Sequence, residues 1–269
     1  MCHHFYPAMA GKKITFLGTG TSVGIPAIGC GCAVCRSGDP RDRRLRCSLW
    51  VREPGASWIV DTGPDLRAQC LRAGITAVDA VILSHPHTDH IMGFDDLRRF
   101  PMPDHDGLPV HASPVTLEML EKAFSFAFHP RARWPGYLHP RPLPIVGPFR
   151  IGTTNVLPFP VVHGATPTLG FRFDCDGGPS VAYLSDAKSV GDEALEVVRG
   201  VDVLICDALR FLPHPTHMNF AEALALSESL GGPRTYFTHI SCDVCHAEAE
   251  KDLPAHVQLA YDTLELDFP

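Results

Sequence analysis

Apolar residues along this chain occur mostly in short runs separated by turn-forming residues. Runs of roughly four to eight apolar or alternating residues, bounded by Gly, Pro, Asn or Asp, favour β-strands. The run at 80–83, for example, reads Ala-Val-Ile-Leu and leads directly into a polar segment. On this basis we expect strands near residues 13–17, 48–52, 57–60, 80–83, 110, 155–162, 169–175, 181–184, 201–206, 236–240 and 257–261.

Longer segments with helical character lie between these strands. The clearest covers residues 64–73, because Pro64 suits the first turn of a helix and Gly74 follows its last residue. The Pro- and Arg-rich segment 129–148 shows neither periodicity, and we expect an ordered surface loop or lid there. We expect further helices at residues 95–100, 114–126, 192–199 and 220–230.

The order of these elements predicts one domain. Each half of the chain contains several strands and then helices, and no long polar or Pro/Gly/Ser-rich stretch divides the 269 residues. Two packed β-sheets with helices on their outer faces accommodate this order. We expect the domain to span residues 13–269, and residues 1–12 to be a disordered tail.

Composition narrows the class of protein. With 45% hydrophobic and 20% charged residues, the chain can bury a large core. The formal net charge of −7 argues against a broad basic surface for a long nucleic acid, but it is compatible with a small anionic substrate held by metal. No apolar run approaches the roughly 20 residues that cross a bilayer, and the first residues lack the apolar core of a signal peptide. We therefore expect a cytoplasmic protein without a membrane partner.

The segment after the strand at 80–83 has the strongest metal-binding pattern in the chain. Residues 85–90 read His-Pro-His-Thr-Asp-His. Since 15 of the 269 residues are His, three His at these offsets would arise by chance about 0.05 times per chain. Neutral imidazoles and a carboxylate are ligands for zinc, manganese or iron. His85 and His87 can face one ion while Asp89 and His90 turn toward a second.

This segment resembles the His-x-His-x-Asp-His signature of the metallo-beta-lactamase superfamily. The resemblance implies an α/β fold of four layers, αββα, in which two mixed β-sheets are flanked by helices. It also implies three later metal ligands, for which His163, Asp186 and His239 are the candidates, and an early Asp that supports the ligand loops, matched by Asp61. By this resemblance the first metal is bound by His85, His87 and His163, the second by Asp89, His90 and His239, and both by Asp186.

The same resemblance implies a metal-dependent hydrolase. Two divalent ions, zinc or manganese, lower the pKa of a water between them and neutralise the oxygens of a bound phosphate. The activated water is then the nucleophile, and Asp89 could also orient it. Taken singly, His163, Asp186 and His239 would be read as ordinary loop or strand-end residues, but their order after the signature favours ligands.

A second candidate metal site lies in the Cys-rich loop at 30–35. Cys30, Cys32 and Cys35 place three thiols within six residues, and three thiolates with one further ligand form a typical structural zinc site. A loop of reduced thiols is the alternative. Ten cysteines in a chain without a secretion signal favour thiols or metal ligands over disulfides. We expect core thiols at the remaining apolar or helical positions, Cys47, Cys70, Cys175 and Cys206.

The Cys triplet and its neighbours resemble a narrower subgroup, the cyclic phosphodiesterases of the carbon-phosphorus lyase pathway. The similarity includes Gly-Thr-Gly at 18–20 and Asp-Pro-Arg at 39–41. In that subgroup the fourth structural ligand is a His three residues after the last active-site ligand. Here this position is Cys242, so the resemblance implies an all-thiolate zinc site, with Cys245 and His246 as alternative fourth ligands.

The subgroup also has a His, just before a late helix, that assists proton transfer. His217 matches it, and such a residue could protonate the leaving alkoxide or hold a phosphate oxygen. An exposed His at the entry of a helix is the alternative, and His214 lies in the same loop. For the basic run Arg41, Arg43, Arg44 and Arg46, we favour a solvated loop over a phosphate site.

These resemblances predict a metal-dependent phosphodiesterase that hydrolyses a small cyclic phosphodiester, such as a ribosyl cyclic phosphate. They also imply a homodimer. A transfer-RNA 3′-processing nuclease has the same signature, but the acidic charge balance and the lack of a long basic arm count against it. A non-catalytic accessory protein of cofactor biosynthesis is the other alternative, and the full ligand set counts against it. A thioesterase or lactonase would have nearly identical ligands.

Overall fold

The computed structural model describes residues 11–100, 107–129 and 138–268, and the structural statements below refer to these ranges. The expected tail at 1–12 lies outside them except for its last two residues. Lys12 already belongs to the first strand, β1 (Lys12–Gly18), which lies in the interior of its sheet.

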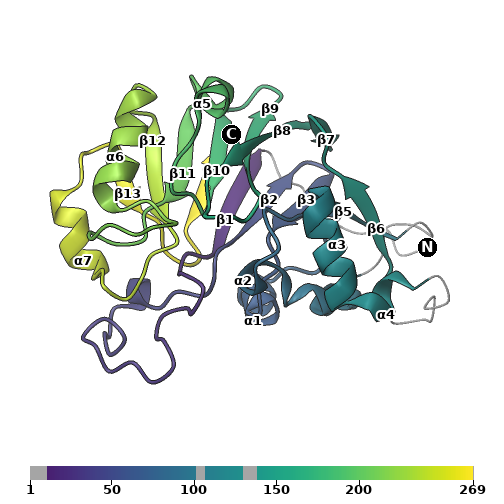
Figure 1. Ribbon diagram of the computed structural model, residues 1–269, viewed down its shortest axis with the longest axis horizontal. Helices are drawn as coiled ribbons and strands as arrows, with labels where there is room; N and C mark the ends of the chain where they lie inside the picture. Colours follow the sequence, from purple (N-terminus) through teal and green to yellow (C-terminus); the bar gives the residue numbers. More distant parts are fainter. Residues whose placement is uncertain (1–10, 101–106, 130–137, 269) are drawn as a thin grey trace.

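Two seven-stranded β-sheets form the two inner layers (Figure 1). The first has the strand order β14-β1-β2-β3-β4-β5-β6, antiparallel from β14 to β3 and parallel from β3 to β6. Its other strands are β2 (Ser48–Glu53), β3 (Ala56–Val60), β4 (Ala80–Ile82), β5 (Leu108–Ala112), β6 (Pro140–Pro144) and β14 (Glu265–Phe268).

The second sheet has the order β13-β12-β11-β10-β9-β8-β7. It is antiparallel from β7 to β10 and parallel from β10 to β13, so both sheets are mixed. Its strands are β7 (Phe149–Ile151), β8 (Thr154–Val161), β9 (Thr168–Cys175), β10 (Ser180–Leu184), β11 (Val203–Asp207), β12 (Arg234–Thr238) and β13 (Val257–Leu259).

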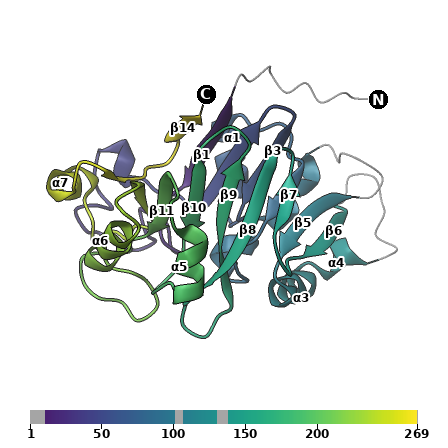
Figure 2. The same cartoon turned by 90° about the horizontal axis from the view of Figure 1, so that it is seen from above.

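Helices cover the outer face of each sheet (Figure 2). On the first sheet lie α1 (Leu66–Ala73), α2 (Thr88–Ile91), the 3-10 helix η2 (Phe94–Arg99), α3 (Pro114–Ala123) and α4 (Ser125–Phe128). On the second lie α5 (Asp192–Val198), α6 (Phe220–Ser229) and α7 (His246–Ala249). Two further 3-10 helices are η1 (Pro40–Asp42) and η3 (Glu250–Asp252). The predicted αββα arrangement is confirmed.

The strands build this layering because successive side chains point to opposite faces. Val60 packs between the two sheets, against residues such as Phe171 and Tyr183 of the second sheet. Its neighbour Ile59 instead packs under the helices of the first sheet, with Leu66 of α1. A third apolar cluster joins the second sheet to α5, α6 and α7.

Three short strands at the edges of the sheets differ from the sequence prediction. The segment 129–148 was expected to be a loop or lid, yet it contributes β6, which pairs in parallel with β5. Pro140, Pro142 and Pro144 alternate along β6, and an edge strand tolerates their missing N–H groups. Residues 130–137 of that segment lie outside the described ranges. Strands β7 and β14 were not predicted, because strands of three and four residues give little periodic signal.

The helices differ from the sequence prediction less than the strands do. The single helix expected at 114–126 is two, since α3 ends at Ala123 and α4 begins at Ser125. The helix expected at 95–100 is the 3-10 helix η2. Within the described ranges, no helix has the length and apolar character that crossing a membrane requires.

The layering predicts a strong effect of truncating the core between the sheets. Phe171 is fully buried there, so Phe171→Ala should lower the free energy of unfolding by about 3–5 kcal/mol in urea denaturation. Phe126→Ala removes the same ring from a side chain that is 45% exposed, and it should cost about 1 kcal/mol or less. Equal losses in the two variants would contradict the assignment of the central core.

Candidate metal centre

The candidate ligands follow the carboxyl ends of strands from both sheets. His85, His163 and Asp186 lie two or three residues beyond the ends of β4, β8 and β10, and His239 directly follows β12. Strands β8, β10 and β12 run in the same direction, because two antiparallel steps separate β8 from β10. Their ends therefore lie at one edge of the sandwich. The loops pack closely there, since a Cβ on Gly63 would collide with the carbonyl oxygen of Asp89.

The first group of candidate ligands consists of His85, His87 and His163. One ring nitrogen from each lies within 4.8 Å of the others. His87 Nδ1 is 2.9 Å from His85 Nε2 and 3.3 Å from His163 Nε2. Three nitrogens thus converge on one point, as the binding of one ion requires.

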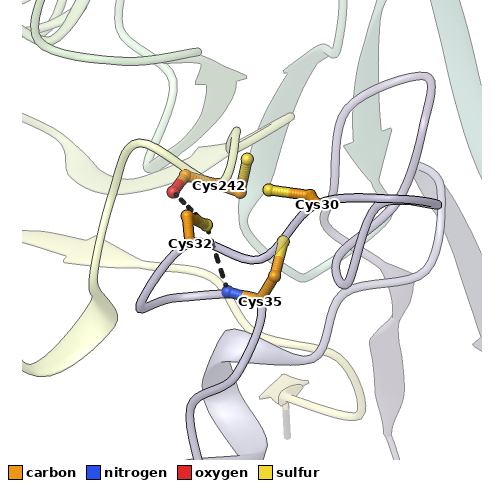
Figure 3. A group of neighbouring side chains, drawn as sticks. All are labelled: Cys30, Cys32, Cys35 and Cys242. Atoms are coloured by element: carbon orange, nitrogen blue, oxygen red, sulfur yellow. Dashed lines mark hydrogen bonds between the residues drawn. The ribbon is translucent and has the colours of Figure 1, made fainter.

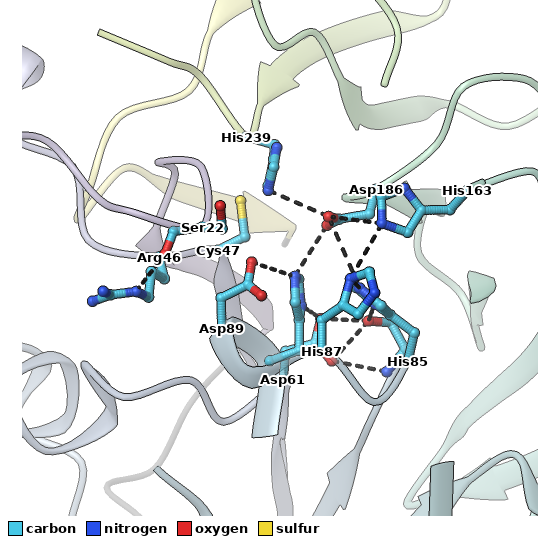
Figure 4. A network of polar contacts seen from close by, with 12 residues as sticks. Ser22, Arg46, Cys47, Asp61, His85, His87, Asp89, His163, Asp186 and His239 are labelled. Carbon is cyan, nitrogen blue, oxygen red and sulfur yellow. Dashed lines mark hydrogen bonds and ion pairs between the residues drawn. The ribbon is translucent and has the colours of Figure 1, made fainter. Parts of the chain in front are cut away.

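The second group consists of Asp89, His90, Asp186 and His239, whose ligand atoms also lie within 4.8 Å of one another (Figure 4). Asp186 Oδ1 is 3.2 Å from His90 Nε2, and its Oδ2 is 3.3 Å from His239 Nε2.

Asp186 reaches both groups. Its Oδ2 also lies 4.0 Å from His85 Nε2 and 3.9 Å from His163 Nε2. The structure therefore brings together all seven residues that the resemblance implies, in the two implied groups with Asp186 between them. Their role as metal ligands stays a prediction.

Asp61 supports both groups from behind, through hydrogen bonds on the far side of the rings. His90 Nδ1 lies 2.8 Å from Asp61 Oδ2, and a carboxylate only accepts, so His90 donates. The Ser84 hydroxyl donates to Asp61 and therefore accepts from His85 Nδ1 at 3.0 Å. Both rings therefore turn Nε2 toward the site, and this atom binds metal once it is unprotonated. Burial lowers the pKa of His90, but the nearby Asp186 and Asp61 outweigh burial and raise it well above its usual range, so a metal ion would displace a proton from its Nε2.

Thr216 has the same effect on His163. Nδ1 of His163 donates to the Thr216 carbonyl oxygen at 3.0 Å, which again turns Nε2 toward the site. His87 has the opposite orientation, because its Nε2 contacts Thr166 Oγ1 at 3.1 Å and its Nδ1 faces the other rings. Sequence reasoning found Asp61 and missed Ser84, Thr166 and Thr216, which come from loops with no distinctive pattern.

The chemistry of these residues fits two divalent metal ions. His90 Nε2, His239 Nε2 and Asp186 Oδ1 are buried and have no hydrogen-bond partner, although buried polar atoms are normally satisfied. Burial and the nearby His90 hold the pKa of His85 well below its usual range, so its ring is neutral, as a ligand must be. Nitrogen and carboxylate donors suit zinc or manganese.

His217 lies against the same site. Its ring stacks on His239, with centroids 4.6 Å apart and planes at 11°, and it meets the His163 ring edge-on at 4.8 Å. The side chain is nearly buried, so the alternative of an exposed helix-entry residue is wrong. His217 Nδ1 is 2.7 Å from Asp207 Oδ2, and His214, the other candidate in this loop, packs on the outer side at 5.0 Å between ring centroids.

Asp207 is the main site residue that sequence reasoning missed. It ends β11, is fully buried, and lies beside both His217 and His239. Burial raises the pKa of Asp207 well above its usual range. Its position at the end of an apolar strand could have identified Asp207, since Asp61 and Asp186 also follow directly or closely after apolar strands.

The Cys-rich loop forms a separate cluster (Figure 3). The Sγ atoms of Cys30, Cys32, Cys35 and Cys242 lie within 4.8 Å of one another. The Cys35 N–H donates to Cys32 Sγ at 3.3 Å, and this bond together with Cys30 lowers the pKa of Cys32 to about 7. Burial raises the pKa of Cys35, and it raises the pKa of Cys242 to about 12, so the fit to a tetrahedral zinc ion rests on the convergence of the four thiols.

Of the proposed fourth ligands, the structure brings Cys242 to the triplet. His246 is turned away, because its Nδ1 lies 2.9 Å from the Arg44 guanidinium and its Nε2 lies 3.1 Å from Glu250. Cys245 belongs to no such cluster of described residues. Among the expected core thiols, Cys47, Cys70 and Cys206 are buried, and Cys175 is only partly buried.

The basic run is not a uniform solvated loop, because three of its four arginines contact other side chains. Arg44 is almost completely buried, donates to His246, and has its pKa lowered by burial to about 10. Arg41 and Arg46 form ion pairs with neighbouring aspartates. Arg43 is exposed, as the solvated-loop interpretation expects.

Comparisons with known proteins show the family to which the chain belongs. Residues 58–240 match the model of the beta-lactamase superfamily domain. The chain belongs to this superfamily. A solved structure of a diphosphatase from the PhnP family aligns with a TM-score of 0.87 and 41% identity, over 96% of this chain and 97% of that one. The chain is thus a PhnP-like hydrolase with the metallo-beta-lactamase fold, and its similarities indicate a metal-dependent hydrolase.

Two sequence relatives carry other names. An octanoyltransferase of Porphyromonas gingivalis is 34% identical over 94% of this chain, but the chain spans only 51% of that protein. A ribonuclease Z of Mycolicibacterium gilvum is 29% identical over 80% of this chain and 72% of its own length. These two relatives have different names, so membership of the superfamily does not by itself identify the reaction.

The Cys cluster gives a matched pair of variants. Cys242→Ser should remove about one zinc per chain and lower the thermal midpoint, because three thiolates and a hydroxyl hold zinc poorly. Cys245→Ser changes a neighbouring cysteine outside the cluster and should keep the zinc. Inductively coupled plasma mass spectrometry measures the content, and equal zinc in the two variants would rule out Cys242 as the fourth ligand.

Proposed function

We propose that the protein hydrolyses a small phosphodiester, with two divalent ions in the candidate metal centre. The observation that carries the proposal is the set of histidines whose outer nitrogens are hydrogen-bonded to Asp61, Ser84 and Thr216, so that their Nε2 atoms face Asp186. Bound there, two ions would lower the pKa of a water and offset the charge of a phosphate. The PhnP-family diphosphatase supports phosphorus chemistry for this site.

The protein's own residues supply the rest of the reaction. Asp89 belongs to the second group and is buried, and we assign it both metal binding and orientation of the attacking water. His217 covers the side of the site formed by His163 and His239. With Nδ1 on Asp207, its Nε2 is the ring atom left to protonate a leaving oxygen or to contact a phosphate oxygen.

A small substrate fits the surroundings of the site better than a long nucleic acid. The charge of −7 opposes binding of a polyanion, and the ion pairs of Arg41 and Arg46 reduce the positive charge nearby. Val162, which precedes His163, and Phe211 and Leu212, in the loop between β11 and α6, are apolar and at least 49% exposed. A compact substrate such as a cyclic ribosyl phosphate therefore remains our proposal, together with a cytoplasmic location and a homodimer.

Transfer-RNA 3′ processing is the second candidate, because a ribonuclease Z is among the relatives. The two candidates separate in one assay, since a precursor transfer RNA and a ribonucleoside 2′,3′-cyclic phosphate can be offered to the same metal-loaded protein. We expect turnover of the cyclic phosphate. Turnover of the precursor alone would favour the nuclease.

Metal removal should abolish the activity. With bis(p-nitrophenyl) phosphate, the metal-loaded protein should release p-nitrophenolate, and a chelator should reduce the rate by at least about 100-fold. Adding back zinc or manganese should restore it, which excludes damage by the chelator as the cause. Activity that survives complete removal of metal would contradict a metal-dependent mechanism.

Asp186 should be essential for turnover but not for folding. Asp186→Ala removes the carboxylate that reaches both ligand groups, so kcat should fall by about 1000-fold or more while the circular dichroism spectrum is kept. Asp176→Ala removes an exposed aspartate that pairs with Arg150, and it serves as the control with unchanged kcat. Full activity of Asp186→Ala would show that Asp186 does not bridge two ions.

A further inference from the structure

A cavity of about 590 Å³ lies on the outer side of the first sheet, between α1 and η2. This volume is within the range of small-molecule sites, roughly 300–1,000 Å³. The floor is apolar, since Leu66, Cys70 and Ile75 each have less than a tenth of their surface exposed. Burial and the nearby Asp96 raise the pKa of Cys70 to about 12, so the floor carries no thiolate. None of the described residues that line the cavity belongs to either candidate metal site.

Positive charge gathers around this cavity. Three arginines and one aspartate line it, in a chain whose formal net charge is −7. Arg98 pairs with Asp95 at 3.1 Å, so its charge is already balanced. In the described part of the chain, Arg67 of α1 and Arg99 of η2 take part in no ion pair or side-chain hydrogen bond. The two walls of the cavity thus each contribute one guanidinium without a partner.

We propose that this cavity binds a small aromatic carboxylate, with its ring on the apolar floor and its carboxylate between Arg67 and Arg99. A guanidinium donates two hydrogen bonds to a carboxylate and also packs against aromatic faces, so two arginines above an apolar floor match both parts of this ligand. The partly buried ring of Phe100 adds an aromatic surface to the wall. A cationic ligand would meet like charges, and an uncharged one would leave both guanidinium groups without a partner.

The two walls of the cavity continue from loops of the candidate metal centre. Helix α1 follows the segment that contains Asp61, and η2 follows the segment that contains His90. The Thr62 N–H donates to the His90 carbonyl oxygen at 2.7 Å, and the Gly93 N–H donates to the Thr62 carbonyl oxygen at 2.8 Å. A ligand held by the two arginines would therefore bridge the two elements that follow these hydrogen-bonded segments.

Binding of 2-naphthoate, measured by isothermal titration calorimetry, tests the site. We expect a Kd of about 1 mM or tighter, and binding at least about tenfold weaker for 2-naphthamide, which has the same rings and no charge. Raising the salt from about 50 to about 500 mM should weaken the binding of the carboxylate only. No binding of 2-naphthoate, or equal affinity for the amide, would overturn the proposal.

Arg67→Met and Arg99→Met test whether the two arginines hold the carboxylate. Met keeps an unbranched apolar side chain and removes the charge, so each change should weaken 2-naphthoate by about tenfold and leave 2-naphthamide within about twofold. Arg43→Met is the matched control, because Arg43 is also exposed and does not line the cavity. Wild-type affinity for 2-naphthoate in both cavity variants would show that the carboxylate binds elsewhere, against the proposal.

Metal removal separates this cavity from the candidate metal centre, where a carboxylate could bind an ion. We expect 2-naphthoate to bind zinc-loaded and chelator-treated protein equally. Thr76→Trp, at an exposed residue that lines the cavity, should abolish binding to both, because the indole would occupy the space of the ligand. A loss of binding on metal removal would locate the probe at the ions and contradict the proposal. The readout is binding, so it decides the role of the cavity even if the proposed phosphodiesterase activity fails.

Discussion

The structure depends on an interaction that offsets the free-energy cost of burying many polar side chains at one edge of the sandwich. His85, His90, His239, Asp89 and Asp186 all have less than a tenth of their surface exposed, and several of their polar atoms make no hydrogen bond. Burying such groups without compensation costs several kcal/mol each, on the order expected for unpaired polar or charged atoms. Divalent ions bound there, as we propose, would supply the compensation, and the metals and this end of the fold would then stabilise each other.

The backbone at two residues of the site has an unfavourable conformation that the surrounding contacts maintain. Three non-glycine residues in the described ranges have positive φ, and two of them are Asp61, at 64°, and His239, at 58°. This conformation costs about 1 kcal/mol or more for a residue with a side chain, and it persists where the surroundings enforce it. Asp61 gains hydrogen bonds from Ser84 and His90 in return. Three residues after His239, Cys242 joins the thiol cluster, which anchors the same loop.

The sequence predicts the layers and the local signature well, and it fails where contacts are distant or elements are short. The signature at 85–90 is recognisable because its spacing is local, whereas His163 and Asp186 could be assigned only by resemblance. Asp207 escaped because its partner, His217, is ten residues away across a loop. The edge strand β6 was not predicted because its alternating prolines are atypical of a strand. In the basic run, no sequence pattern distinguishes the buried Arg44 from the exposed Arg43.

The central claim is that two ions share one carboxylate at this edge of the sandwich. Anomalous diffraction from crystals of the zinc-loaded protein tests it most directly. We predict one peak among His85, His87 and His163, and a second beside His90 and His239, with Asp186 between them. A single peak, or peaks that Asp186 does not contact, would contradict the account.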